Sequence, residues 1–256
     1  MTWRTSGLIG ASVSSYVTNT GVPELPHLPP DYSHHDDLYR RFRERGANGW
    51  NDEQADSYKE MFQFISPDLP QASSEKPVQT LEIGCGAGNF SLLLAQHGYA
   101  VTGVDISPTA IEWACDRSNA SHMDMDFRVD NVLNLSTCHD ATFDLVVDGH
   151  CLHCIIGEDR AICLASVYRV LKPGGSFVVL TMCGEVTNQK MLKSFDHDRK
   201  VTIHQGQPTR YIGAAAAILS EVIAAGFVAE GVRVVPRKDA DDLDNLILRA
   251  KKPVKF

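Results

Sequence analysis

The sequence predicts an α/β fold in which helices cover both faces of a doubly wound, mostly parallel sheet. From Val78 onwards, short β-prone runs alternate with helical patterns, which is the order that produces parallel strands between helices. The first β-prone run ends in a glycine-rich turn, Gly84-Cys85-Gly86-Ala87-Gly88, and a helical pattern follows at once. The second run ends at Asp105, 21 positions after Gly84, where doubly wound folds place an acidic side chain at the ligand site.

Seven strands are expected in this sheet. Five parallel strands are expected near Thr80–Gly84, Ala100–Asp105, Met125–Val129, Phe143–Asp148 and Ser176–Thr181. Two more β-prone segments, Phe227–Pro236 and Asn245–Lys251, are joined by an acidic turn over Lys238–Asp244. This arrangement favours an antiparallel pair, so we expect an antiparallel C-terminal strand to close the sheet.

Helical patterns connect the strands near Asn89–His97, Pro108–Ser118 and Arg160–Leu171. Pro173-Gly174 is expected to end the third helix, because proline cannot continue a helix and glycine suits its C-terminus. An alanine-rich helix is expected over Gly213–Ala225, with Gly226 able to stop it. The stretch 182–212 is mostly polar and interrupts the alternation. Insertions of that length in a compact domain are commonly lids or binding loops.

The segment before the sheet is expected to form a partly mobile arm followed by a helical cap. Residues 1–30 are rich in Thr, Ser and Gly, and prolines crowd the end of this stretch. Helical patterns follow over Asp36–Arg45 and Asp52–Ile65, the second begun by Asn51 or Asp52 as its cap. We therefore divide the chain into an arm and cap over residues 1–76 and a core domain over residues 77–256.

Composition argues against several classes of protein. The 256 residues are 43% hydrophobic and 22% charged, which is ordinary for a soluble protein. The net charge of −8 and the pI of about 5.6 argue against nucleic-acid binding, which normally uses a basic face. No run approaches the ~18 apolar residues of a membrane span, and no secretion signal is expected. Seven scattered cysteines indicate reduced thiols, so we expect a cytoplasmic location.

The glycine-rich turn distinguishes between ligand classes. Asn89 stands where a dinucleotide-binding G-x-G-x-x-G/A motif needs its last small residue. A phosphate-binding loop needs a Gly-Lys-Ser/Thr ending, and no lysine occurs between Gln79 and Asp105. Neither pattern therefore fits this turn.

The set of motifs instead resembles the class I S-adenosylmethionine-dependent methyltransferases. Glu82-x-Gly84-x-Gly86-x-Gly88 resembles motif I of that family, Asp105 its ribose-binding acid, and Asp130-Asn131 its adenine-contacting segment. Phe143–Val147 is similar to its fourth strand, and Val170–Gly175 to the turn into its fifth. Five motifs in this order imply a Rossmann-like fold and methyl transfer, with S-adenosyl-L-methionine as cofactor and S-adenosyl-L-homocysteine as product.

The resemblance implies a set of cofactor-binding residues: Glu82, Gly84, Gly86, Gly88, Asp105, Ile106, Asp130, Asn131 and Asp148. Amide donors at the glycine turn and at the N-terminus of the next helix can hold the cofactor's carboxylate. Glu82 lies in an apolar strand, where burial of a carboxylate without a partner is expensive. Its implied role is to order the glycine loop or to contact the cofactor's ammonium group. The alternative is an exposed side chain at the strand edge.

The stretch Asp148–Cys154, at the end of the fourth strand, contains the candidate catalytic residues His150 and His153. An imidazole titrates near working pH, so either side chain can act as a general base or position the acceptor. A structural alternative is that Leu152-His153-Cys154 corresponds to the Leu-His-His that often lines the cofactor in this family. A metal site that uses His150, His153 and Cys183 is a further alternative, although the paired spacing of a structural zinc site is absent. A Cys151/Cys154 redox pair would need a thioredoxin-like context, which the glycine motif contradicts.

Substrate contacts are expected from the stretch 182–212, which we interpret as a substrate-binding insertion, and from the cap. In the insertion, Arg210 can form a bidentate pair with a carboxylate, and Tyr211 is a second candidate; a plain surface arginine is the alternative. In the cap, Tyr39, Trp50 and Tyr58 are candidates for a lid, and Tyr39 is expected to touch the substrate. Ordinary aromatic packing is the alternative for these three residues.

We therefore expect an enzyme that transfers a methyl group from S-adenosylmethionine to an O, N or S atom of a small polar metabolite, one that can carry a carboxylate. The transfer is an in-line displacement with His150 as candidate base or positioning group. Three alternatives stay open: a metal-assisted methyltransferase, methylation of a protein or peptide, and a non-catalytic regulatory protein that binds the cofactor. We expect no nucleic-acid or membrane partner, and a monomer or homodimer.

Overall fold

The computed structural model describes residues 30–50, 57–73, 75 and 77–254. The expected N-terminal arm, apart from its last residue, and the expected helix cap at Asn51 or Asp52 lie outside these residues. No helix in the described residues is long and apolar enough to cross a membrane.

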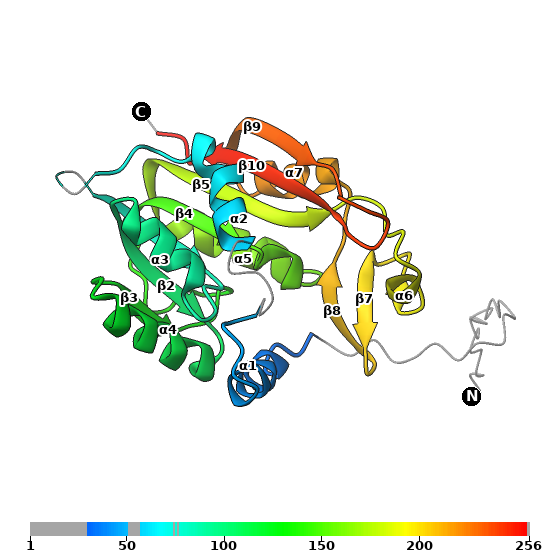
Figure 1. Cartoon of the computed structure of the whole chain (residues 1–256). Coiled ribbons are helices and arrows are strands. Elements are labelled where there is room, and N and C mark those ends of the chain that lie inside the picture. The colour runs from blue at the N-terminus through cyan, green and yellow to red at the C-terminus, as the bar shows by residue number, and fades with distance from the viewer. Residues whose placement is uncertain (1–29, 51–56, 74, 76, 255–256) are drawn as a thin grey trace, which may run out of the picture.

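The centre of the molecule is a seven-stranded sheet with the strand order β3-β2-β1-β4-β5-β10-β9 (Figure 1). Its strands are β1 (Val78–Ile83), β2 (Tyr99–Asp105), β3 (Asp126–Val129), β4 (Phe143–Gly149), β5 (Leu171–Cys183), β9 (Val228–Val235) and β10 (Asp244–Lys251). The first five strands pair in parallel, and β10 runs antiparallel to both of its neighbours, β5 and β9. The predicted doubly wound sheet with an antiparallel C-terminal strand is confirmed.

Helices cover both faces of this sheet, as Figure 1 shows. The helices are α1 (His34–Glu44), α2 (Ser57–Ile65), α3 (Asn89–Gln96), α4 (Pro108–Ser121), α5 (Asp159–Val170), α6 (Gln189–Leu192) and α7 (Ala215–Ala224), with short 3-10 turns η1 (Ser66–Asp68) and η2 (Leu152–Cys154). Because side chains alternate along a strand, Leu145 and Val147 pack towards α2 and α3, and Val146 packs towards α5 and α7. All three side chains are fully buried, so the central strand β4 is apolar on both faces.

The junction between α5 and β5 differs from the expected one. Helix α5 ends at Val170, and Leu171 is already extended, with φ −72° and ψ 138°. A residue that precedes proline is disfavoured in the helical region, so Lys172 cannot extend the helix and the chain turns into strand before Pro173. Strand β5 therefore spans 13 residues and pairs with Phe143 already at Leu171, with a register shift after that pair.

The insertion over residues 182–212 forms a small sheet of its own beside the main one (Figure 1). Strands β6 (Phe195–Asp196), β7 (Val201–His204) and β8 (Gln207–Tyr211) pair in antiparallel order. A separate apolar cluster of Val186, Ile212 and Leu243 anchors this sheet to the acidic turn before β10. Strand β8 also contacts the η2 turn, and this contact brings the insertion to the carboxyl end of β4.

The described part of the N-terminal segment docks against the same end of the sheet. Asp36 of α1 accepts hydrogen bonds from Ser107 Oγ at 2.7 Å and from the Thr109 amide at 3.0 Å, at the start of α4. Arg43 pairs across the same interface with Asp116 at 2.6 Å. These contacts hold α1 over the carboxyl ends of β1 and β2, where a doubly wound fold binds its ligand.

Candidate functional site

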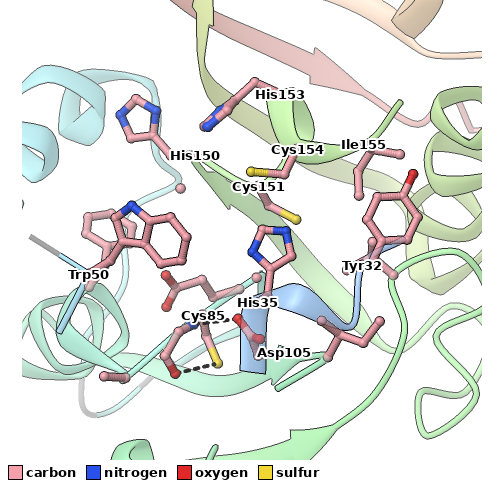
Figure 2. Close-up of a pocket in the computed structure, with 18 of the residues that line it drawn as sticks. Tyr32, His35, Trp50, Cys85, Asp105, His150, Cys151, His153, Cys154 and Ile155 are labelled. Carbon is pink, nitrogen blue, oxygen red and sulfur yellow. Dashed lines mark hydrogen bonds between the residues drawn. The ribbon is translucent and has the colours of Figure 1, made fainter. Parts of the chain in front are cut away.

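A pocket of about 270 Å³ lies at the carboxyl ends of β1, β2 and β4. Residues from these strand ends, from α1 and α2, and from η2 and β8 line it (Figure 2). This is the crevice in which parallel α/β sheets bind ligands, because the strand order reverses there between β1 and β4.

The glycine turn forms the floor of the pocket. Gly84, Gly86 and Gly88 have φ values of +63°, +54° and +73°, which are left-handed conformations that glycine adopts without strain. A Cβ on Gly84 would lie 2.7 Å from the Cβ of Cys151, and a Cβ on Gly86 would collide with the Tyr39 hydroxyl. The turn therefore needs glycine for its backbone and for its close contacts. Gly88 does not line the pocket, since it faces Ala114 and Phe127 instead.

Asp105 is fixed at the rim of this turn. Its Oδ2 accepts the Gly86 amide and its Oδ1 accepts the Ser107 amide, both at 2.9 Å. Its side chain lines the pocket although the residue is only 7% exposed, and burial raises the pKa of this carboxyl to about 6. The carboxylate is therefore held rigidly where it can accept hydrogen bonds from ligand hydroxyl groups.

Glu82 places a second carboxyl in the pocket. It is 2% exposed and accepts a hydrogen bond from Ser91 Oγ on α3. Burial, together with the charges of Asp105 and Asp148, raises the pKa of Glu82 to about 8. A buried carboxyl of this kind is stabilised in its ionised form by a positively charged group of a ligand.

Asp130 lies behind the pocket and does not line it. Its two oxygens accept hydrogen bonds from the amides of Asn131, Ser136 and Thr137 and from the hydroxyls of the latter two residues. Burial alone would raise the pKa of Asp130, but these hydrogen bonds bring it below its ordinary value. Asp130 thus orders the loop, and its neighbour Asn131 and the nearby Ile106 line the pocket.

Asp148, like Asp130, holds a loop in place, in this case the turn that follows β4. Its Oδ1 accepts the amides of Cys151 at 2.6 Å and Leu152 at 3.0 Å, and it does not line the pocket. Burial raises its pKa to about 7. The side chain therefore fixes the turn that carries His150 and His153.

The two candidate catalytic histidines do lie together in the pocket, with ring centroids 5.6 Å apart (Figure 2). His150 has φ +74°, a strained conformation for a non-glycine residue and one that is enriched at functional sites. Burial, followed by the charge of Arg210, lowers the pKa of His150 to about 4, and burial also holds the pKa of His153 well below its ordinary value. Nδ1 of each ring is buried without a hydrogen-bond partner in the described residues. Both imidazoles are thus neutral at pH 7 and have an unused polar atom.

A third histidine, His35 of α1, lines the same end of the pocket and was missed in the sequence interpretation. Burial lowers its pKa to about 4. A signal for it existed: His35 precedes Tyr39 by four residues, so the two share one face of α1. Tyr39, Trp50 and Tyr58, the lid candidates, also line the pocket. Tyr32, which donates a hydrogen bond to Asp159 at 2.9 Å, lies beside them and was likewise missed.

The insertion contributes one of its two candidates. Arg210 lines the pocket, whereas Tyr211 does not, because successive side chains of a strand point to opposite faces. We expected Tyr211 to contact the substrate because it follows Arg210 in the sequence, but neighbours along a strand do not face the same side.

The alternative metal cluster of His150, His153 and Cys183 is not formed. Cys183 packs in the apolar core on the α5 and α7 face of the main sheet and does not line the pocket. Within the described residues, no group of three or more His, Cys, Asp or Glu side chains is arranged to hold a metal ion. Cys151 and Cys154 are free thiols, and burial raises the pKa of Cys154 to about 12, so these thiols are not activated for redox exchange.

Comparisons with known proteins agree with this geometry. Residues 81–179 match the protein family described as a methyltransferase domain. The S-adenosyl-L-methionine-dependent Diels-Alderase iccD of Talaromyces variabilis is 36% identical over 107 residues, which cover 39% of this chain and 35% of that protein. Norajmaline N-methyltransferase of Rauvolfia serpentina is 32% identical over 111 residues, which cover 42% of this chain and 37% of that protein. The chain thus matches little more than a third of the length of these two relatives.

A solved structure has the same fold over most of the chain. It is the 1,6-didemethyltoxoflavin-N1-methyltransferase of Burkholderia thailandensis with bound 1,6-didemethyltoxoflavin and S-adenosylhomocysteine, with a TM-score of 0.63 and 20% identity. The similarity covers 89% of this chain and 93% of that chain. The glycine turn, the fixed Asp105 carboxylate and the buried Glu82 also fit the ribose and the cationic amino-acid end of S-adenosylmethionine. Residues 81–179 thus match a methyltransferase domain, and the chain has the Rossmann-like fold of S-adenosylmethionine-dependent methyltransferases, with a pocket whose residues fit this cofactor.

Proposed function

We propose that this protein transfers a methyl group from S-adenosylmethionine to an O, N or S atom of a small polar acceptor. The observation that carries the proposal is the shared pocket, which the glycine turn, Glu82 and Asp105 line together with neutral imidazoles. The names of two similar proteins, norajmaline N-methyltransferase and 1,6-didemethyltoxoflavin-N1-methyltransferase, support a small-molecule acceptor.

Three groups of residues would hold the cofactor. The Asp105 carboxylate suits the ribose hydroxyls, and Ile106 and Asn131 suit the adenine end. Glu82 and the Gly84 and Gly86 backbone suit the amino-acid end, where a carboxylate replaces the water that the ammonium group loses. When bound, S-adenosylmethionine supplies an activated methyl group beside the imidazoles.

His150 is proposed as the general base for acceptors that arrive protonated. Its neutral ring can take the acceptor's proton on a ring nitrogen. In the balanced reaction, the acceptor's lone pair forms the bond to the methyl carbon, the carbon–sulfur pair stays on sulfur, and the proton moves to His150. A carboxylate or thiolate acceptor needs no base, and His150 then positions it for in-line attack.

We also propose the division of the chain into a cap over residues 1–76 and a core over residues 77–256, with residues 182–212 as the substrate-binding insertion. His35, Tyr39 and Trp50 line the pocket from the cap, and Arg210 lines it from the insertion. Substrate selection is therefore assigned to the two segments that lie outside the motifs of the family.

A second candidate function is a cofactor-dependent reaction other than methyl transfer. The specific reason is that the relative from Talaromyces variabilis is named as a Diels-Alderase. The partly aromatic wall of the pocket, with Tyr32, Trp50 and Phe90, suits an apolar substrate that is folded for cyclisation.

One experiment separates these functions. The full chain is incubated with S-adenosylmethionine labelled in its methyl group and with fractions of a metabolite extract, and the products are separated by mass. Methyl transfer predicts label in a low-mass product together with an equal amount of S-adenosylhomocysteine. Conversion of a metabolite with no change in the labelled cofactor would establish the second function and refute the first.

A further inference from the structure

The pocket brings together four nitrogen-bearing side chains from separate elements. His35 comes from α1, His150 follows β4, His153 lies on η2, and Arg210 lies on β8. Figure 2 shows the three imidazoles around one space, beside Cys151 and Cys154. Since none of the four is part of the glycine motif, this group forms a separate subsite, which we call the acceptor subsite.

Arg210 provides the positive charge of the acceptor subsite. Two other arginines with limited exposure do have a carboxylate partner, Arg160 with Glu221 at 2.6 Å and Arg237 with Asp244 at 3.1 Å. Across the described ranges, the guanidinium of Arg210 forms no such ion pair. An arginine that lines a pocket without an acidic partner is available to bind an anionic group of a ligand.

The histidines of the acceptor subsite have unused hydrogen-bonding atoms. His153 is only 5% exposed, and its Nδ1 has no partner in the described residues. Nδ1 of His150 is also buried and also has no hydrogen-bond partner in the described residues. Buried polar atoms of side chains usually have a partner, and those that lack one need an explanation, such as a missing ligand.

The charges around the acceptor subsite limit what that ligand can be. Arg210 is the one Lys or Arg among the described residues that line the pocket, and the lining carboxyls among them are Glu82 on β1 and Asp105 at the end of β2. Beyond the lining residues, the charges of Arg160 and Asp242 also act on the histidines. One guanidinium balances one negative charge, so a phosphate dianion is poorly matched. The remaining wall includes Tyr32, Ile155 and Met182 and favours an apolar body.

We propose that the acceptor is a largely apolar molecule with a single carboxylate, which Arg210 binds in the acceptor subsite together with a histidine N–H donor. This inference deepens the proposed methyl transfer and rests on it for the identity of the neighbouring cofactor. It assigns Arg210 to substrate binding and leaves His150 free to act on the methyl-accepting atom.

The test compares aromatic carboxylates with their uncharged amides. Binding of benzoate, phenylacetate and indole-3-acetate, each beside its amide, is measured by calorimetry and ligand-observed NMR on the full chain saturated with S-adenosylhomocysteine. We expect at least one carboxylate to bind in the millimolar range or better and to bind more tightly than its amide. Arg210→Gln should weaken that carboxylate at least about 10-fold, as loss of a charge-assisted hydrogen bond does, and should leave the amide unchanged.

Lys193→Gln is the matched control, because it removes one positive charge from the same insertion at an exposed position outside the pocket. It should leave carboxylate binding unchanged. Equal binding of every carboxylate and its amide, or equal loss in the two variants, overturns the inference. If S-adenosylhomocysteine itself fails to bind, the proposed function fails, and the same titrations on the free protein still decide the role of Arg210.

Discussion

Arg210 and Tyr211 are consecutive on β8, but their side chains have different partners on opposite faces of the strand. Arg210 lines the pocket, whereas the ring of Tyr211 lies under the guanidinium of Arg160, with Arg160 Cζ 4.2 Å from the ring centroid. Arg160 also donates hydrogen bonds to the carbonyls of Leu152 at 2.6 Å and Ile155 at 3.1 Å. One buried guanidinium therefore joins the strand that carries Arg210 to the turn that carries His153.

Replacement of this guanidinium is expected to destabilise the protein. Arg160 is 4% exposed and pairs with Glu221. Arg160→Met would leave Glu221 and two carbonyls without their donor, and loss of one partner of a buried pair typically costs about 3–5 kcal/mol. Urea unfolding measures the change in the free energy of unfolding. The surface control Arg128→Met, which breaks an exposed pair with Asp126, should cost less than about 1 kcal/mol. Equal costs for the two variants would contradict the joining role of Arg160.

Asp105→Ala is expected to weaken binding of both S-adenosylmethionine and S-adenosylhomocysteine by at least about 10-fold. The variant loses the proposed acceptor for the ribose hydroxyls and leaves the Gly86 and Ser107 amides without their acceptor. Isothermal titration calorimetry measures both affinities. Asp126→Ala removes an exposed carboxylate from β3 and should change neither value. Unchanged affinities in Asp105→Ala would refute the role assigned to the carboxylate, and tight binding of NAD by the wild type with no binding of either ligand would refute the assigned cofactor.

His150→Asn tests the proposed base without a change in backbone strain, because asparagine tolerates the left-handed conformation at φ +74° better than alanine does. We expect turnover to fall roughly 10²–10⁴-fold while cofactor affinity is kept. The exposed His204→Ala is the control.

The pH–rate profile gives a second test of His150. Because the pKa of His150 is lowered to about 4, the wild-type base stays unprotonated at neutral pH, and activity should decline only as the pH falls towards that value. The residual rate of the variant should instead rise with pH, as the acceptor loses its own proton. A variant profile identical to that of the wild type would exclude His150 as the base.

Glu82→Gln is expected to stabilise the cofactor-free protein at pH 8. The folded-state pKa of Glu82 is raised from 4.5 to about 8, so the folded state keeps a proton that the unfolded state has already released. Its contribution to stability is therefore present below the ordinary pKa and is lost as the pH rises through about 8. A gain of about 1 kcal/mol corresponds to roughly 2–4 °C in Tm for a chain of this size.

Thermal unfolding of the wild type and of Glu82→Gln between pH 5 and pH 8 measures this effect. The variant should show a smaller decrease of Tm over this range and weaker binding of S-adenosylmethionine, because it lacks the charge that suits the ammonium group. Parallel Tm curves for the two proteins would show that Glu82 does not titrate in this range.

Asp36→Ala tests the cap. The variant removes the acceptor for Ser107 Oγ and the Thr109 amide, so α1 should detach more readily and S-adenosylhomocysteine should dissociate faster. Loss of a helix-capping acceptor costs about 1 kcal/mol, too little to unfold the core. Stopped-flow measurement of the dissociation rate provides the readout, with the exposed Asp37→Ala as control. Deletion of residues 1–50 should have a larger effect in the same direction. Unchanged dissociation in both would assign the segment another role.

The sequence alone determined the main sheet and the glycine turn that lines the pocket, because both depend on local signals. The alternation of β-prone and helical runs predicts the parallel strands, and β9 and β10 follow from two β-prone segments with an acidic turn between them. The glycines of the turn adopt its left-handed backbone without strain, and Asp105 follows Gly84 by 21 positions along the chain. These features need no knowledge of distant contacts.

The tertiary structure decided which side chains from distant elements line the pocket. His35 reaches it only because Asp36 docks α1 on the start of α4, a contact between residues 71 positions apart in the sequence. Tyr211 is directed away from the pocket by the pleat. The Asp130 oxygens accept hydrogen bonds from their own loop, and Asp148 Oδ1 accepts two amides of the turn after β4. The type and spacing of a residue do not specify which face of an element its side chain occupies or which donors bind it. The packing of distant elements determines both properties.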